Sequence, residues 1–346
     1  MKYDILLSGS ALAGNPTELF FGLFYYDGDE ALEIPGRHPF EGEWGRPLST
    51  QVLEEESYPI PYRIDMIWLD IPEGKFYSLE KELPTEDIQS LWETKDSSGN
   101  DIYRYLIAGM APGGRIALWA YGPEKSCLIG WYAGKETSVD MEEFIPMNPD
   151  ISLREFCLAY GYDIMRPSRA SMELRTEFGK MMNRFKYRYV VLFQNWNEDE
   201  KKWENYEEDD KVVAPELCYI EDSLSDGTFD KLHDESLFKY HFGGKPQKMT
   251  LKWKIKKSEY SAHLWFEDER ICYIFEKFYG VHRDTNTDFI IHIDVEKRKY
   301  ELALYRYGLS EPVIIPEETY QMIVFKNKFE HYRSQNYSQR RGAWIW

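Results

Sequence analysis

Apolar side chains recur at every second position over residues 63–70 and again over residues 248–255. A period of two predicts a β-strand with one face buried against a core. Trp68 and Trp253 stand at the same place in the two rows, each following two smaller apolar residues. The two stretches therefore predict equivalent strands, although they lie far apart in the chain.

The same series of elements is expected after each of these strands. A second strand is predicted around Phe76–Leu83 in the first series and around Tyr260–Phe266 in the second. A helix follows, because apolar residues then recur at spacings of three and four. Thr85 and Asp268 stand at the expected N-cap positions of these helices. The matching apolar residues are Ile88, Leu91 and Trp92 in one helix and Ile271, Ile274 and Phe275 in the other.

A hairpin completes each series. In the first, it turns at Ala111–Gly114, where Pro-Gly-Gly is a strong hairpin signal. In the second, it turns at the charged tip Glu296–Lys299. One more strand is predicted at Ser126–Tyr132 and at Val313–Ile315, and further helices at Leu153–Tyr160 and Ser168–Met182.

The two series align without gaps over three blocks in the same order. The blocks pair residues 63–70 with 248–255, 77–93 with 260–276, and 101–122 with 287–308. We therefore predict an α+β fold of two tandem duplicated units, each an antiparallel sheet with one packed helix. Trp68 is expected to superpose on Trp253, and Ile88 on Ile271. The predicted domains are residues 1–165, a connecting helix 166–184, and residues 185–346 with an acidic insertion at 198–235.

Composition narrows the class of protein. The chain has 346 residues, enough for two units with cores of their own. Its four cysteines are widely spaced, which favours free thiols over a disulfide framework, and we expect no metal and no cofactor. No stretch reaches the roughly 20 apolar residues that span a bilayer. Asp4 interrupts the start of the chain, so no leader is expected. These features predict a cytoplasmic protein, monomeric with internal pseudo-symmetry.

Acidic residues outnumber basic ones, and the formal net charge is −18. The densest part is residues 198–235, with fifteen acidic residues and four lysines. One interpretation is a solvated loop between the units. The other is a docking surface for a basic partner, with nucleic acid disfavoured because the field repels phosphate. The residues that would contact such a partner are Trp203, Tyr206, Glu207, Glu208, Asp209 and Asp210.

Catalytic motifs are absent: the sequence has no GxSxG, HExxH, Walker loop or GxGxxG after a strand. His292 and Asp294 share one face of a predicted strand and could form a general-base pair. Their counterparts in the first series are Ala108 and Met110, so the repeated scaffold does not carry that pair. We therefore predict a protein that is not an enzyme, with a hydrolase or small-molecule-binding enzyme as the alternative, its site in the second unit.

Two segments of the first half resemble a known family. They are WLDIPEGKFYSLEKELP at Trp68–Pro84 and MAPGGRIALWAYGP at Met110–Pro123. Both are similar to an uncharacterised bacterial family, domain of unknown function 2931, and the resemblance extends over about residues 1–160. Many members resemble lipoproteins, but this chain lacks an early cysteine for lipid attachment and adds a divergent second series. No catalytic residues can be carried over from the resemblance, because none is established for the family.

A non-catalytic binding protein agrees best with these observations. An inhibitor needs a rigid scaffold and a complementary surface, and the resemblance favours an antitoxin or immunity protein that neutralises a basic bacterial toxin. The competing binding role is that of a structural module in a cell-envelope assembly, which lipoprotein relatives would favour.

Overall fold

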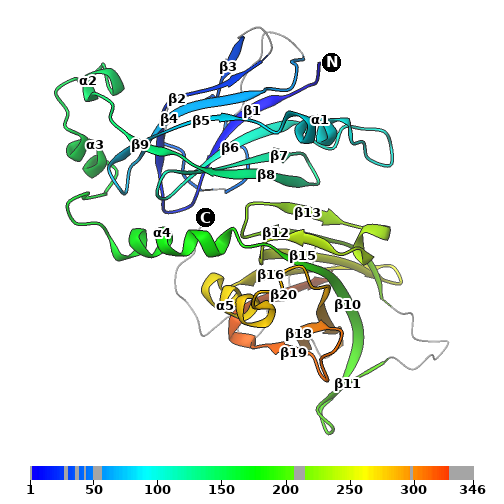
Figure 1. Cartoon of the computed structure of the whole chain (residues 1–346). Helices are drawn as coiled ribbons and strands as arrows, with labels where there is room; N and C mark the ends of the chain where they lie inside the picture. The colour runs from blue at the N-terminus through cyan, green and yellow to red at the C-terminus, as the bar shows by residue number, and fades with distance from the viewer. Residues whose placement is uncertain are drawn as a thin grey trace. The chain divides into compact units, whose positions relative to one another are not determined.

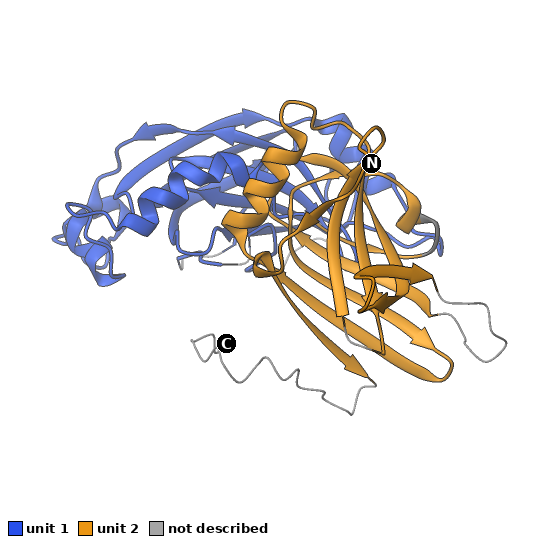
Figure 2. Cartoon of the chain, turned by 90° about the horizontal axis from the view of Figure 1, so that it is seen from below, with its two compact units in different colours: residues 1–182, 226–228 blue, residues 183–225, 229–346 orange. Residues whose placement is uncertain are grey.

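The chain forms two compact units in the computed structural model. Unit 1 comprises Met1–Met182 with Asp226–Thr228, and unit 2 comprises Asn183–Ser225 with Phe229–Trp346 (Figure 2). The structure describes residues 2–26, 30–35, 39–42, 44–49, 57–205, 215–296 and 299–326. The helix predicted to connect the units groups with unit 1.

The described residues of unit 1 form two sheets and four helices (Figure 1). The first sheet has the order β1-β6-β7-β8: Leu6–Ala11, Tyr105–Ala111, Arg115–Tyr121 and Ser126–Ala133. The second has the order β3-β2-β4-β5-β9: Ala31–Glu33, Thr17–Tyr25, Arg63–Asp70, Lys75–Glu82 and Lys135–Thr137. The helices are α1 Thr85–Glu93, α2 Met141–Phe144, α3 Leu153–Ala159 and α4 Arg169–Met181.

The core of unit 1 lies between its two sheets. Leu7 and Leu118 from the first sheet and Trp68 from the second are fully buried in one apolar cluster. Helix α1 closes this cluster with Ile88 and Trp92, the two buried residues of its apolar stripe. Burial of so much aromatic and aliphatic surface is the main contribution to the stability of such a sandwich.

Helices α2, α3 and α4 cover further apolar surface of the same unit. Phe178 of α4 belongs to a cluster with Trp119 on β7, so α4 packs on the face of the first sheet that is turned away from the core. Phe144 of α2 and Phe156 of α3 pack with Phe76 of β5. Both faces of the sheets therefore carry apolar side chains where a helix covers them.

Unit 2 also has two sheets. The first contains β11-β10-β17-β18-β19, with β14 paired to β10: Lys202–Asn205, Phe185–Asn197, Thr287–Asp294, Lys299–Arg306, Val313–Ile315 and His241–Gly243. The second has the order β13-β12-β15-β16-β20: Phe229–Leu232, Glu216–Leu224, Pro246–Ile255, Ser258–Phe266 and Tyr320–Lys326. Helix α5 spans Asp268–Tyr279, and two short 3-10 helices span Asp234–Phe238 and Glu317–Thr319. Ile271 and Phe275 of α5 lie in the same buried cluster as Trp253.

The α+β class and the mainly antiparallel sheets are confirmed, but the prediction of one sheet per unit is wrong. Each unit has two sheets, and each contains one parallel pair, β1–β6 in unit 1 and β10–β17 in unit 2. Strand β1 lies far from β6 in sequence. Parallel neighbours need a long crossover connection, so short-range sequence patterns do not reveal their pairing.

The helix starts also differ from prediction by one residue. Helix α1 has Pro84 at its N-cap and α5 has Glu267, and neither side chain makes a capping hydrogen bond. The Thr85 hydroxyl donates to Leu83 O instead, and Asp268 accepts from Gln247 Nε2. Short polar side chains readily form such local or lateral hydrogen bonds in place of capping.

The acidic segment 198–235 is not a loop throughout. Strands β11, β12 and β13 all lie within it, and β12 pairs with β15 along most of its length. Asp222 is buried and accepts hydrogen bonds from Tyr189 Oη and from the backbone N–H of Asp230. Some of the acidic residues are therefore structural, which sequence charge alone does not reveal.

Candidate functional site

A buried carboxylate, Asp70, ends strand β4 in unit 1 and organises the turn that follows. Its Oδ1 accepts the backbone N–H of Glu73 at 3.2 Å, and its main-chain carbonyl accepts Gly74 N at 2.8 Å. Aspartate is suited to this position because its short side chain can bond the backbone of the next turn. Gly74 has φ of +60°, a conformation that favours glycine.

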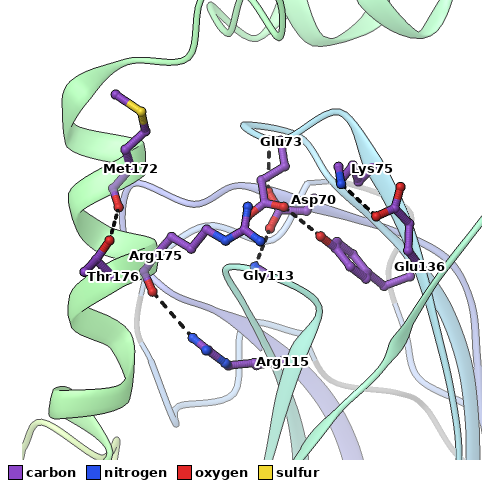
Figure 3. Close-up of polar contacts among 10 residues, drawn as sticks. Asp70, Glu73, Lys75, Gly113, Arg115, Glu136, Met172, Arg175 and Thr176 are labelled. Atoms are coloured by element: carbon purple, nitrogen blue, oxygen red, sulfur yellow. Dashed lines mark hydrogen bonds and ion pairs between the residues drawn. The ribbon is translucent and has the colours of Figure 1, made fainter.

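The second oxygen of Asp70 reaches another hairpin. Oδ2 accepts the backbone N–H of Gly113 at 3.3 Å, at the tip between β6 and β7 (Figure 3). Gly113 and Gly114 have φ of +72° and +71°, and a Cβ on Gly114 would lie 2.2 Å from Cδ1 of Tyr77. The Pro-Gly-Gly sequence therefore serves both the turn and the close approach of the two hairpins.

Two side chains contact the Glu73 carboxylate. Tyr77 Oη on β5 donates to Glu73 Oε2 at 2.7 Å. From α4, Arg175 Nη1 lies 3.2 Å from Glu73 Oε1, while the main-chain carbonyl of Arg175 accepts a 3.5 Å bond from Arg115 (Figure 3). The Glu73 side chain is only 13% exposed but that of Arg175 is 55% exposed, so the ion pair is shielded from water mainly on the Glu73 side. We call Asp70, Glu73, Tyr77, Gly113 and Arg175 the Asp70 junction.

Burial dominates the electrostatics of the Asp70 junction. Burial, together with the nearby Glu73 carboxylate, raises the pKa of Asp70 to about 7, although the two backbone N–H donors act in the opposite direction. Burial and the hydrogen bond to Glu73 raise the pKa of Tyr77. Burial, with a contribution from Asp70, raises the pKa of the Cys157 thiol on α3 to about 11. The junction can therefore take up one proton near neutral pH, but its central carboxyl is 0% exposed and does not face solvent.

A second buried carboxyl lies on the neighbouring strand. Glu18 of β2 is 7% exposed, and its Oε2 has no hydrogen-bond partner among the described residues. Burial raises the pKa of Glu18 to about 7. Glu18 pairs across the ladder with Leu69, one residue before Asp70. Asp70 and Glu18 in unit 1 are thus two carboxyl groups whose pKa values lie near neutral pH, because burial disfavours the charged form.

Of the residues predicted to contact a partner, Trp203 is described and lies on β11. Its ring is half-buried, stacked on His292 with centroids 5.1 Å apart, and its Nε1 donates to Glu301 Oε1 at 2.9 Å. The others, Tyr206, Glu207, Glu208, Asp209 and Asp210, lie outside the described residues.

His292 and Asp294 stand on one face of β17, as their spacing predicts. The Nδ1 of His292 lies 2.6 Å from Gln194 Oε1, and Asp294 Oδ2 accepts the backbone N–H of Trp196 at 2.7 Å. Burial lowers the pKa of His292, which favours the neutral ring, although Glu301 opposes this. Both side chains thus help to tie β10 to β17 in the first sheet of unit 2.

The Asp70 junction was missed by sequence reasoning. The available signal was that Asp70, Glu73, Tyr77 and Gly113 fall in the two segments that carry the family resemblance, WLDIPEGKFY and MAPGGRIALWAYG, whereas Arg175 lies outside both. Neither segment contains a sequence signal that predicts its contact with the other. Within the described ranges no three His, Cys, Asp or Glu side chains form a metal-ligand group, and no helix has the length and apolar character to cross a membrane.

Comparison with known proteins gives one match to a family model, over part of unit 1. A family model described as Protein of unknown function (DUF2931) matches residues 32–173, a span that begins and ends later than the expected 1–160 and includes no part of unit 2. No curated protein and no solved structure matches the chain. Residues 32–173 of unit 1 are therefore similar to the DUF2931 family, and this span contains Asp70, Glu73, Tyr77 and Gly113.

Proposed function

We propose that this protein is a non-catalytic binding protein that holds a basic protein partner, such as a bacterial toxin, through an acidic surface of unit 2. The observation that carries the proposal is the hairpin of β10 and β11. Its turn presents Glu198, Asp199 and Glu200, three consecutive exposed acidic residues. Clustered carboxylates at an exposed turn attract and orient a cationic partner. We call these three residues the acidic tip.

Aromatic packing gives the acidic tip a rigid base. Trp196 and Trp203 face each other across β10 and β11 with centroids 5.2 Å apart. Lys299 Nζ lies 3.5 Å from the centroid of Trp196. A rigid aromatic base lowers the entropy lost when a partner binds, which supports a role in recognition.

Part of the local negative charge is neutralised within the hairpin. Lys202 lies within ion-pair distance of both Glu200 and Glu204. Glu198 and Asp199 therefore supply most of the attraction from the tip. The net charge of −18 adds a longer-range field that favours encounter with a cation.

We also propose that the two units arose by duplication. Their second sheets have corresponding orders, with a helix after the fourth strand of each. Trp68 pairs with Tyr77 across β4 and β5, as Trp253 pairs with Tyr260 across β15 and β16. The ring centroids lie 5.9 Å and 5.7 Å apart, and both indole Nε1 atoms are buried without a hydrogen-bond partner among the described residues.

The contacts of His292 and Asp294 support a structural role over the alternative of a hydrolase in unit 2. A general base needs a reacting group within hydrogen-bond reach. The Nδ1 of His292 already lies at hydrogen-bond distance from Gln194, and Trp203 covers one face of its ring. Hydrolytic activity that is lost in His292→Ala, with the fold retained, would contradict the proposal.

Affinity capture with matched charge variants tests the proposed function. The test variant carries Glu198→Lys, Asp199→Lys and Glu200→Lys. The control carries Glu142→Lys, Glu143→Lys and Asp150→Lys, which are exposed residues of unit 1 and give the same change in net charge. We expect the wild type and the control to retain a basic protein at low salt, and the test variant to lose it. Equal capture of a basic protein by the two variants would contradict the role proposed for the acidic tip.

A further inference from the structure

The edge strand of the second sheet differs between the two units. In unit 2, β20 pairs with β16 over Tyr260–Phe266. In unit 1, β9 occupies the corresponding place beside β5 but pairs only with Phe76–Ser78. Beyond Ser78, no described strand pairs with the outer edge of β5.

The register defines which residues correspond. Trp68 opposes Tyr77, and Trp253 opposes Tyr260. Two positions further along, Leu79 opposes Met66 in unit 1, and Ala262 opposes Leu251 in unit 2. Another two positions along, Lys81 opposes Ile64 in unit 1, and Leu264 opposes Met249 in unit 2. The part of β5 that lacks a neighbour is thus the part whose counterpart in unit 2 pairs with β20.

The backbone groups of this edge point outward. Leu83 N donates to Tyr62 O at 2.8 Å, on the side of β4. In an antiparallel strand, the N–H and C=O of one residue point to the same side, and alternate residues point to opposite sides. The N–H and C=O groups of Glu80 and Glu82 therefore face the unpaired edge. An open row of such groups is a template for another strand.

A cleft lies along the same edge. It has a volume of about 720 Å³ and is lined by Leu79, Glu80, Lys81, Glu82, Tyr132 and Lys135, among others. Lys81 projects toward β8 of the other sheet, with its Nζ 5.6 Å from the centroid of Tyr132. Arg63 pairs with Glu80 at 3.2 Å, which leaves the ammonium groups of Lys81 and Lys135 as the main charges beside Glu82.

We propose that the β5 edge over Leu79–Glu82 is a second interaction surface, which binds an extended strand of a partner protein antiparallel to β5. We expect the bound strand to pair with β5 as β20 pairs with β16, where Val324 opposes Ala262 and Met322 opposes Leu264. The corresponding residues of the partner strand face Leu79 and Lys81. The partner strand therefore carries an apolar residue opposite Leu79 and a carboxylate opposite Lys81, because a lysine replaces the leucine of unit 2.

The β5 edge is defined by the strand order and register of unit 1 and is independent of the acidic tip. Main-chain hydrogen bonds supply affinity in strand addition, and the alternate side chains supply specificity. Charged side chains on an edge also discourage pairing between copies of a protein. An experiment must therefore separate strand addition from an edge that only resists pairing.

The test uses two synthetic peptides and the full chain. One peptide has the sequence of residues 320–326, and the other carries Met322→Glu at the position expected to face Lys81. Fluorescence polarisation of the labelled peptides gives the affinity. We expect the Met322→Glu peptide to bind about threefold or more tightly than the parent peptide, and Lys81→Glu in the chain to reverse that preference.

Glu80→Pro and Glu80→Ala provide the matched pair of chain variants. Both remove the Glu80 carboxylate, but only proline removes the outward N–H. We expect Glu80→Ala to bind the peptide like the wild type and Glu80→Pro to bind it about tenfold more weakly or not at all. Circular dichroism reports whether Glu80→Pro folds, and the reversal by Lys81→Glu tests the proposal if it does not.

Three results would overturn the proposal: no peptide binding, equal binding by Glu80→Pro and Glu80→Ala, or a preference unaffected by Lys81→Glu. Light scattering adds a further criterion. A dimer that Glu80→Pro dissociates would mean that the edge binds a second copy of this chain and not a partner strand.

Discussion

The carboxylate of Asp70 accepts the backbone N–H of Gly113 at 3.3 Å, and this contact joins the β4–β5 hairpin to the β6–β7 hairpin. The two segments that carry the family resemblance therefore meet at one buried side chain. Glu73 extends the junction to Tyr77 and to Arg175 on α4. The segments are thus coupled by their part in one polar junction inside unit 1.

The first prediction concerns pH. The pKa of Asp70 is about 7 in the folded chain against a reference value of 3.8, so the folded state holds the more protons between these values. The free energy of unfolding therefore falls as pH rises from about 4 to about 7, by up to about 4 kcal/mol from this group. Asp70→Asn should flatten this dependence. Urea unfolding at a series of pH values measures it.

Glu18 contributes to the fall in the free energy of unfolding over the same pH range, because burial raises its pKa to about 7 as well. Asp70→Asn combined with Glu18→Gln should therefore remove more of the pH dependence than either change alone. Unfolding free energies that rise between pH 4 and 7 in the wild type would contradict the account of both groups.

The second prediction concerns the Pro-Gly-Gly turn. Gly114→Ala places a methyl group against the Tyr77 ring at a residue with φ of +71°. We expect a loss of about 2–4 kcal/mol in the free energy of unfolding, from backbone strain and overpacking together. Gly99→Ala is the control, because Gly99 has φ of +86° but nothing within 4 Å of an added Cβ. Its cost should be only about 1 kcal/mol, and similar costs would show that the contact with Tyr77 is unimportant.

The third prediction concerns the link between α4 and the hairpins. Arg175→Ala leaves the mostly buried Glu73 carboxylate without its cation, so we expect a loss of about 1–2 kcal/mol. Arg169→Ala is the matched control on the same helix. Arg169 pairs with Glu173, but its side chain is 88% exposed, so its removal should cost about 0.5 kcal/mol or less. Thermal or urea unfolding of both variants compares them, and a larger cost at Arg169 would contradict this interpretation.

Local pattern predicted the elements better than their assembly. The strand around Trp68, the helix stripe of Ile88 and Trp92 and the hairpin at Gly113 are confirmed, because each depends on residues close in sequence. The pairing of β1 with β6 escaped prediction, because the two strands, Leu6–Ala11 and Tyr105–Ala111, lie far apart in sequence. Alternation shows that a strand is half-buried, but it does not identify the sheet that covers it.

The Asp70 junction was inaccessible for the same reason. An aspartate after an apolar strand reads as an ordinary turn residue. Its burial and its contact with Gly113 exist only once two hairpins have packed together. The density of acidic residues suggested that the whole segment 198–235 is exposed to solvent. Asp222 belongs to this segment but is buried and hydrogen-bonded.

The central claim, that the acidic tip binds a basic partner, is tested most directly by affinity at two salt concentrations. The measurement is the Kd of the captured partner for the wild type, for the variant with Glu198, Asp199 and Glu200 changed to lysine, and for the control with Glu142, Glu143 and Asp150 changed to lysine. We predict that raising salt from about 50 to about 500 mM weakens binding of the wild type and the control, because it screens the attraction. The tip variant should bind at least about tenfold more weakly at low salt and respond little to salt. Affinities that are the same for all three proteins, or independent of salt in the wild type, would contradict the claim.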